Sequence, residues 1–166
     1  KNEKSLEFLQ EQFQTRKVIK KYTALAVGNL KTERGTIETF ISRSPGDRRK
    51  QMAYPKNDSK GTGERLAISD YRVLQKFKNY DLIEIEPKTG RKHQIRAHLV
   101  YLSHPLAGDK LYGFKNQPCP KGLKRQFLHA SYLKIGLPNG KTLEFKSELP
   151  EDLKNALQTL ETNNSA

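Results

Sequence analysis

The sequence has few cysteines, few acidic residues and no long apolar run, and each shortage excludes a class of protein. Its single cysteine, Cys119, leaves no internal disulfide, so a reducing, cytoplasmic setting is expected. No apolar run approaches the roughly 18 residues that span a bilayer, so no membrane partner is expected. The start at residues 1–4 resembles neither a signal nor a transit peptide. It also lacks an initiating Met, which indicates a processed or excised fragment.

Common catalytic motifs are missing as well. No Gly-x-Ser-x-Gly occurs, and Cys119 lies in a Pro-flanked stretch without an evident base. The only Gly-x-Gly, at 61–63, is followed by Glu64-Arg65 rather than by a phosphate-binding motif. His93 and His98 are five residues apart, roughly 140° around a helix, and would not share a metal. We therefore predict neither a cofactor nor a metal, and a metal-dependent hydrolase that uses the histidines is a third, weaker hypothesis.

Positive charge is the dominant feature of the composition. Lys and Arg number 31 against 18 Asp and Glu, a formal charge of +13, and the pI is near 9.8. A polyanion is the natural partner of such a chain, and cations interleaved with aromatic residues in loops suit RNA. The alternative is that each cation is an ordinary solvated surface group. The candidate RNA-binding residues are Arg48, Arg49, Lys50, Arg91, Lys92, His93, Lys124 and Arg125.

The hydrophobic pattern predicts a single α+β domain with a mixed, largely antiparallel sheet and flanking helices. Helical spacing of Leu, Ala and Phe predicts helices over 4–14 and from Pro150 onward, and the polar tail 162–166 should be flexible. Nothing in the sequence indicates an oligomer interface, so a monomer is expected. Alternating or β-branched segments predict strands over 20–27, 35–41, 51–54, 66–75, 80–86, 127–137 and 142–146.

The segment 89–99 joins a turn, several cations and a short amphipathic helix. A turn at Thr89-Gly90 is predicted from the ability of Gly to adopt positive φ, and a helix should start near Arg91. Ile95 and Leu99 fall on one apolar stripe, and Arg96 stands beside it. A guanidinium at such a boundary needs a carboxylate, a phosphate or backbone carbonyls as partner. Spacing alone leaves open whether Arg96 is functional or only satisfies local carbonyls.

Several motifs in a fixed order resemble the RluA-type family of RNA pseudouridine synthases, and the resemblance covers nearly the whole chain. The resemblance implies the pseudouridine synthase catalytic fold, isomerisation of uridine in structured RNA, ribosomal RNA first and transfer RNA as an alternative, and no cofactor. The motifs are KYTALAVG at 21–28, GRKHQIRAHL at 90–99, HPLAGD at 104–109, YG at 112–113, RQFLHA at 125–130 and SELP at 147–150.

The resemblance also implies roles for three residues. Tyr22 matches the tyrosine that stacks on the target base and is a candidate to remove the C5 proton, although strand periodicity alone would make it a sheet-face tyrosine. Arg96 matches the basic residue that pairs with the catalytic aspartate, and Ile95 matches the apolar residue beside it. An ion pair would hold that carboxylate ionised and oriented.

One departure from the family concerns the nucleophile. The family's aspartate lies in an Arg-Leu-Asp motif followed by Thr-Ser-Gly, which this sequence lacks. Asp109 matches a family position that we interpret as structural. We therefore expect 1–161 to be the C-terminal portion of the catalytic domain, inactive alone, with 162–166 a tail. The rival hypothesis is a non-catalytic, basic RNA-binding module.

Overall fold

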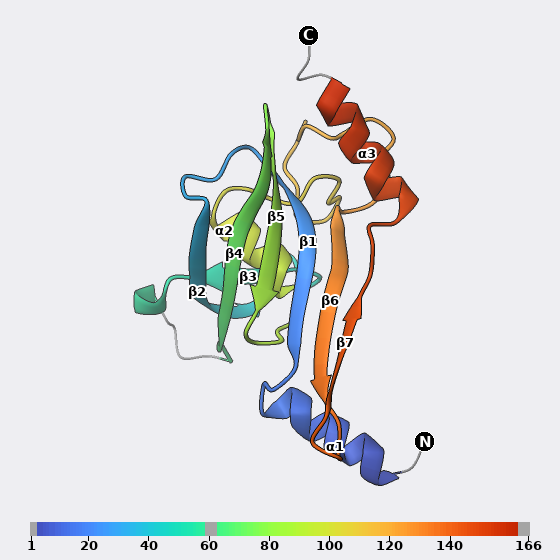
Figure 1. The fold of residues 1–166 in the computed structure, drawn as a ribbon. Helices are drawn as coiled ribbons and strands as arrows, with labels where there is room; N and C mark the ends of the chain where they lie inside the picture. Colours follow the sequence, from blue (N-terminus) through green and yellow to red (C-terminus); the bar gives the residue numbers. More distant parts are fainter. Residues whose placement is uncertain (1–2, 59–62, 163–166) are drawn as a thin grey trace.

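The computed structural model describes residues 3–58 and 63–162. Within these ranges, seven strands form one sheet, three α-helices lie around it, and a 3₁₀ helix, η1, follows β3 (Figure 1). In chain order, the elements are α1 (Glu3–Gln14), β1 (Ile19–Val27), β2 (Arg34–Arg43), β3 (Gln51–Tyr54), η1 (Lys56–Asp58), β4 (Arg65–Phe77), β5 (Tyr80–Pro87), α2 (Gln94–Tyr101), β6 (Leu128–Gly136), β7 (Thr142–Lys146) and α3 (Glu151–Thr162).

The strand order is β3-β2-β4-β5-β1-β6-β7, and every pair of neighbouring strands is antiparallel. This confirms the predicted α+β class with a largely antiparallel sheet, and β4–β5 and β6–β7 form the two predicted hairpins. Both β3 and β7 match their predicted bounds. The predicted tail, apart from Thr162 at the end of α3, lies outside the described residues, as does the 59–62 part of the predicted loop.

Strand β1 lies inside the sheet, between β5 and β6, and contributes residues to the core on both faces. Ala24 and Ala26 pack with Ile83, Leu99 and Leu106 on the face that α2 covers. The other side of the same strand, which includes Leu25, packs with residues of α3. The alternation read from the sequence therefore has a physical cause, because successive strand residues point to opposite faces.

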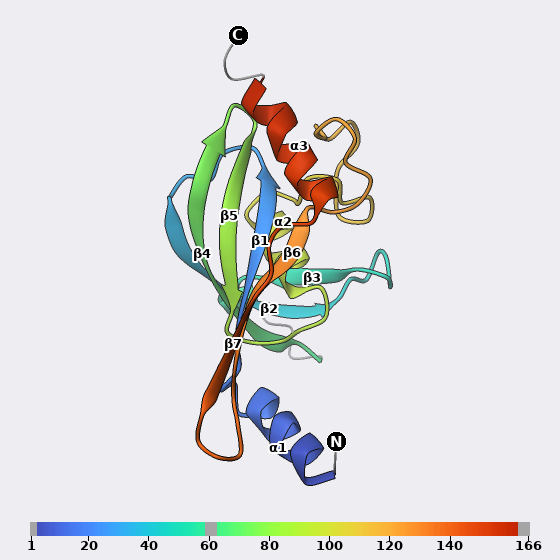
Figure 2. The same ribbon diagram turned by 45° about the vertical axis from the view of Figure 1, so that its right-hand side comes forward.

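The sheet curves so that its β2–β3 end bends around α2 (Figure 2). Helix α3 lies against the end of the sheet near β1 and β6, and α1 lies beside the tip of the β6–β7 hairpin (Figures 1 and 2). Helix α1 forms as predicted, yet Leu6 and Phe13 on its apolar stripe are 57% and 52% exposed. Among the described residues, no helix has the length and apolarity to cross a bilayer.

Candidate active site

The loop between β5 and α2 is fixed by one buried side chain, Gln94. Its Oε1 accepts hydrogen bonds from the Thr89 hydroxyl at 2.7 Å and from the Arg91 N–H at 2.9 Å. Its Nε2 donates to the Ile68 carbonyl and to Ser69 Oγ, both at 2.9 Å. A buried amide with all these partners ties the loop to β4 and leaves no polar atom unsatisfied.

Two details of the sequence prediction are wrong here. Helix α2 begins at Gln94 rather than near Arg91, because His93 adopts the left-handed conformation (φ 53°) and interrupts the helical backbone. The residue with positive φ in this turn is His93, whereas Gly90 is outside that region. A Cβ on Gly90 would lie 3.8 Å from Lys20 Nζ, so the ammonium group of Lys20 sits directly over this turn.

Arg96 projects from α2 and is held by Asp109. Nε donates to Oδ2 at 2.7 Å and Nη2 donates to Oδ1 at 2.6 Å, a paired arrangement of two parallel bonds. The two side chains are only 14% and 1% exposed. Segment 105–107, which precedes Asp109, bonds to β1, and Gly108 (φ 71°) lets the backbone pass the Arg125 carbonyl, which a Cβ would approach to 2.3 Å.

Both oxygens of the Asp109 carboxylate accept hydrogen bonds. Besides Arg96, Oδ1 accepts the backbone N–H groups of Leu111 and Tyr112, each at 3.0 Å. Burial by itself would raise the pKa of Asp109, but these hydrogen bonds and the charge of Arg96 outweigh it and hold the pKa below its usual value. With 1% exposure and both oxygens bonded, Asp109 is an anchor for Arg96 and is unsuited to attack a substrate.

Tyr112 covers the other side of the guanidinium. Its ring centroid lies 4.5 Å from Arg96 Cζ. Its hydroxyl accepts the Gln51 N–H at 2.6 Å and lies 3.1 Å from His93 Nδ1. Burial, followed by the charges of Arg96 and Lys92, lowers the pKa of His93, which favours the neutral imidazole, whose Nδ1 can accept a hydrogen bond from the Tyr112 hydroxyl.

A cavity of about 370 Å³ opens beside Arg96, and its volume is within the size range of small-molecule sites. Tyr22, Ile95 and Arg96, the three predicted catalytic residues, all line it, so the structure brings them together. None of the described residues that line it is acidic. The lining residues are Lys20, Tyr22, Pro87, Thr89, Gly90, Arg91, His93, Gln94, Ile95, Arg96, Gln126 and Leu128.

Two polar groups at this cavity have no protein partner within residues 3–58 and 63–162. Nη1 of Arg96 makes no hydrogen bond there, and since no buried polar atom is unsatisfied, it reaches solvent-accessible space. The Tyr22 hydroxyl likewise makes no protein hydrogen bond, although its ring packs on the core that contains Ala24 and Ile95. Both groups can therefore contact a molecule in the cavity.

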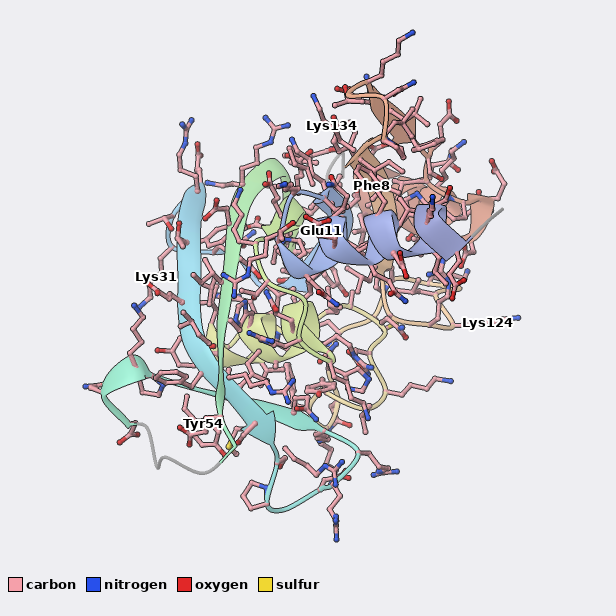
Figure 3. All side chains as sticks on the ribbon, turned by 90° about the horizontal axis from the view of Figure 1, so that it is seen from below. Phe8, Glu11, Lys31, Tyr54, Lys124 and Lys134 are labelled. Atoms are coloured by element: carbon pink, nitrogen blue, oxygen red, sulfur yellow. The ribbon has the colours of Figure 1, made fainter. Side chains whose placement is uncertain are left out.

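The predicted RNA-binding residues occupy three different settings. Arg91 and His93 line the cavity, and Lys50 Nζ lies 6.0 Å from the centroid of the Tyr112 ring. Arg49 and Arg125 form ion pairs with Asp47 and Asp152, which reduces their charge toward a ligand. The exposed members outside these ion pairs are Arg48, Lys92 and Lys124, and the side chain of Lys124 extends outward in Figure 3.

Gln94, Asp109 and Tyr112 were not predicted as site residues. Each makes at least one hydrogen bond to a residue 13 or more positions away, which no local periodicity could reveal. The only signal was their position inside the recognised motifs, as part of HQIR, GD and YG. Among the described residues, no group of three His, Cys, Asp or Glu side chains could hold a metal ion.

Comparison with known proteins finds the family that the sequence motifs resemble. Residues 1–101 match the family model for RNA pseudouridylate synthase. An uncharacterized RNA pseudouridine synthase of Chloroflexus aurantiacus is 38% identical over 162 residues, 97% of this chain and 48% of that protein. Ribosomal large subunit pseudouridine synthase D of Escherichia coli K12 is 31% identical over 164 residues, 92% of this chain and 48% of that protein.

A solved structure agrees with the sequence matches. Human RNA Pseudouridylate Synthase Domain Containing 4 superimposes with a TM-score of 0.79 at 28% identity, covering 96% of this chain and 69% of that chain. The chain belongs to the RNA pseudouridine synthases, in the RluA-type family. It spans about half the length of the curated relatives that it matches.

Proposed function

We propose that this chain is the C-terminal portion of the catalytic domain, residues 1–161, of an enzyme that isomerises uridine to pseudouridine in structured RNA. The observation that carries the proposal is the shared cavity of Tyr22, Ile95 and Arg96. Ribosomal RNA is the proposed substrate, since two relatives are named for the large ribosomal subunit, and transfer RNA is the alternative. The cytoplasm is the proposed location and a monomer the proposed state.

The roles follow from the chemistry of the reaction. An aspartate starts cleavage of the bond between N1 of uracil and the sugar, the uracil turns, and C5 bonds to the sugar in its place. The proposed aspartate belongs to an Arg-Leu-Asp segment outside this chain, and the unbonded Nη1 of Arg96 is the group that would pair with it. Ile95 would limit water around that pair, which strengthens it.

Tyr22 has two proposed tasks in the same cavity. Its ring offers a stacking surface that offsets part of the cost of removing the base from the RNA stack. Its hydroxyl, with no protein partner among the described residues, is placed to take the proton that C5 must lose. The predicted cations around the cavity would hold the RNA backbone while the base is bound.

The decisive experiment incubates the intact protein, including any sequence before Lys1, with ribosomal RNA and separately with transfer RNA, and maps pseudouridine. Pseudouridine at defined positions supports the proposal, and its loss after Asp→Asn in an upstream Arg-Leu-Asp motif supports the division of the site. The lack of an acidic residue at the described cavity favours the second candidate, a non-catalytic RNA-binding module. RNA binding with no pseudouridine on any RNA would establish that candidate instead.

A further inference from the structure

A second cavity, of about 270 Å³, lies between the end of α1 and the loop after β5. It shares Lys20, Thr89, Gly90 and Arg91 with the first cavity, so the two cavities adjoin along these residues. The remaining lining residues are Phe13, Gln14, Arg16, Val18 and Lys88. Four of its nine residues are cations, and none of the described residues that line it is acidic.

The charge in this second cavity is mostly uncompensated. Lys88 pairs with Asp70 at 3.2 Å and with Glu86. In contrast, Arg16, Lys20 and Arg91 form no ion pair with any described residue. Arg91 is half-buried, and its Nε donates to the Leu66 carbonyl at 3.0 Å. Three cations gathered without an anion repel one another, so binding of an anion there would be favourable.

The repulsion among these cations affects the pKa of Arg91. Burial, followed by the charges of Arg65 and Arg16, lowers the pKa of Arg91 below that of a free guanidinium. A partly desolvated arginine with only a carbonyl as partner lacks the anion that usually accompanies such a group. Phe13 is the one aromatic residue of this cavity, and Lys20 Nζ lies over its ring, 5.7 Å from the centroid. The cavity is suited to a charged group rather than to a base.

We propose that Arg16, Lys20 and Arg91 form a binding site for the phosphodiester group next to the target uridine. This inference rests on the proposed function, because it takes the first cavity as the site of the base. The phosphate adjoining a bound base must lie within one backbone unit of it, and Lys20 and Arg91 stand on the edge that the two cavities share. The ammonium group of Lys20 lies over that edge, 3.8 Å from the position that a Cβ on Gly90 would take.

The test measures binding of a short uridine-containing RNA to the intact protein by fluorescence anisotropy over a range of salt concentrations. We expect Arg16→Gln, Lys20→Gln and Arg91→Gln each to weaken binding, roughly tenfold where one hydrogen bond to a charged group is lost. Each should also reduce the slope of log K against log salt by about 0.7 to 1. Lys31→Gln and Arg34→Gln are matched controls, exposed cations that line neither cavity, and should change neither quantity.

A second measurement begins with the wild-type protein, so its first result does not depend on the folding of any variant. Replacing single phosphates of the RNA by neutral methylphosphonates should weaken binding most at a linkage flanking the target uridine. The effects of that modification and of Arg91→Gln on the free energy of binding should not be additive, because both changes remove the same contact. Additive effects, or variants and controls that bind alike, would overturn the phosphate site.

Pseudouridine formation in the same samples separates this inference from the proposed function. Normal isomerisation with unchanged binding in all three variants would overturn the phosphate site alone. Weakened binding in the variants without any pseudouridine in the wild type would support the phosphate site and contradict the proposed function.

Discussion

Asp109 binds only one edge of the Arg96 guanidinium. Its two oxygens take Nε and Nη2 at 2.7 and 2.6 Å, while Nη1 on the other side has no acceptor among the described residues. An arginine clamped in this way has a fixed orientation before any substrate or further carboxylate arrives, which is the arrangement that a preorganised site requires. The ion pair therefore connects the stability of the fold to the geometry of the cavity.

Removing the charge of Asp109 should destabilise the protein strongly. In Asp109→Asn the guanidinium of Arg96, 14% exposed, loses its only carboxylate partner, and breaking such a buried pair costs about 3–5 kcal/mol. Urea denaturation followed by circular dichroism measures the change. Asp152→Asn is the matched control, because Arg125 and Asp152 form a similar two-bond pair in an exposed position. Equal losses in the two variants would contradict the argument from burial.

Substituting Arg96 by Lys tests orientation apart from charge. Lysine keeps the positive charge, but it cannot form two parallel bonds to Asp109 and still present a further nitrogen toward the cavity. We expect pseudouridine formation by the intact protein to fall at least about 100-fold, through kcat more than through KM. Arg96→Ala is a poorer test, since it leaves Asp109, 1% exposed, without its counterion. An Arg96→Lys enzyme with wild-type kcat would remove the proposed role.

Tyr22→Phe separates the two tasks proposed for this residue. The ring, packed on the core beside Ala24, is retained, so binding of RNA should be nearly unchanged. Loss of the hydroxyl should slow formation of pseudouridine by about 100-fold or more, as for removal of a general base. Tyr132→Phe, a tyrosine outside the first cavity, is the control. If Tyr22→Phe makes product at the wild-type rate, the hydroxyl has no part in proton transfer.

The sequence was sufficient for features that depend on local patterns. Strand alternation in β1 correctly separated Ala24 and Ala26 from Leu25, because period-two spacing decides which face a side chain reaches. Helix α1 was also predicted, but whether its apolar stripe is buried depends on the rest of the fold and not on the local sequence. Leu6 and Phe13 are exposed, since the described part of the chain offers them no facing core.

The polar framework of the site could not be predicted in the same way. Motif resemblance brought Tyr22, Ile95 and Arg96 to notice, but not the partner of Arg96, because Asp109 lies in an irregular loop whose path depends on bonds to β1. The left-handed backbone conformation of His93 could not be predicted from the sequence either. Such a conformation is unusual for a residue other than Gly, and here the Gln94 hydrogen bonds to β4 and the contact of His93 with Tyr112 stabilise it from outside the turn.

Gln94→Leu should loosen the loop that lines both cavities. The substitution nearly preserves the volume but removes the acceptor of the Thr89 hydroxyl and of the Arg91 N–H, whereas the Ile68 carbonyl keeps its bond from the Lys88 N–H. Unsatisfied buried groups cost about 1–3 kcal/mol each, so we expect a loss of at least about 2 kcal/mol in the free energy of unfolding. Gln75→Leu, at an exposed position of β4, should have little effect. Hydrogen exchange of the 88–93 amides would show the loosening, and unchanged protection would contradict it.

His98 should make the protein less stable in mild acid. The imidazole is fully buried between Ser69 Oγ at 3.0 Å and Thr39 Oγ1 at 3.1 Å, and burial lowers its pKa to about 4. The unfolded chain, with an ordinary pKa near 6.5, binds the proton more readily between these two values. Stability is therefore complete above about pH 6.5, falls by about 1.4 kcal/mol per pH unit as the pH drops toward 4, and levels off below it.

A His98→Gln variant isolates this contribution from that of the carboxylates. Glutamine can still bond to Ser69 and Thr39 but takes up no proton, so its free energy of unfolding should change less between pH 7 and pH 5 than that of the wild type. Urea titrations at the two pH values measure both slopes, and their difference belongs to His98, since every carboxylate is common to both proteins. Parallel slopes would mean that the buried imidazole is protonated as readily in the folded protein as in the unfolded chain.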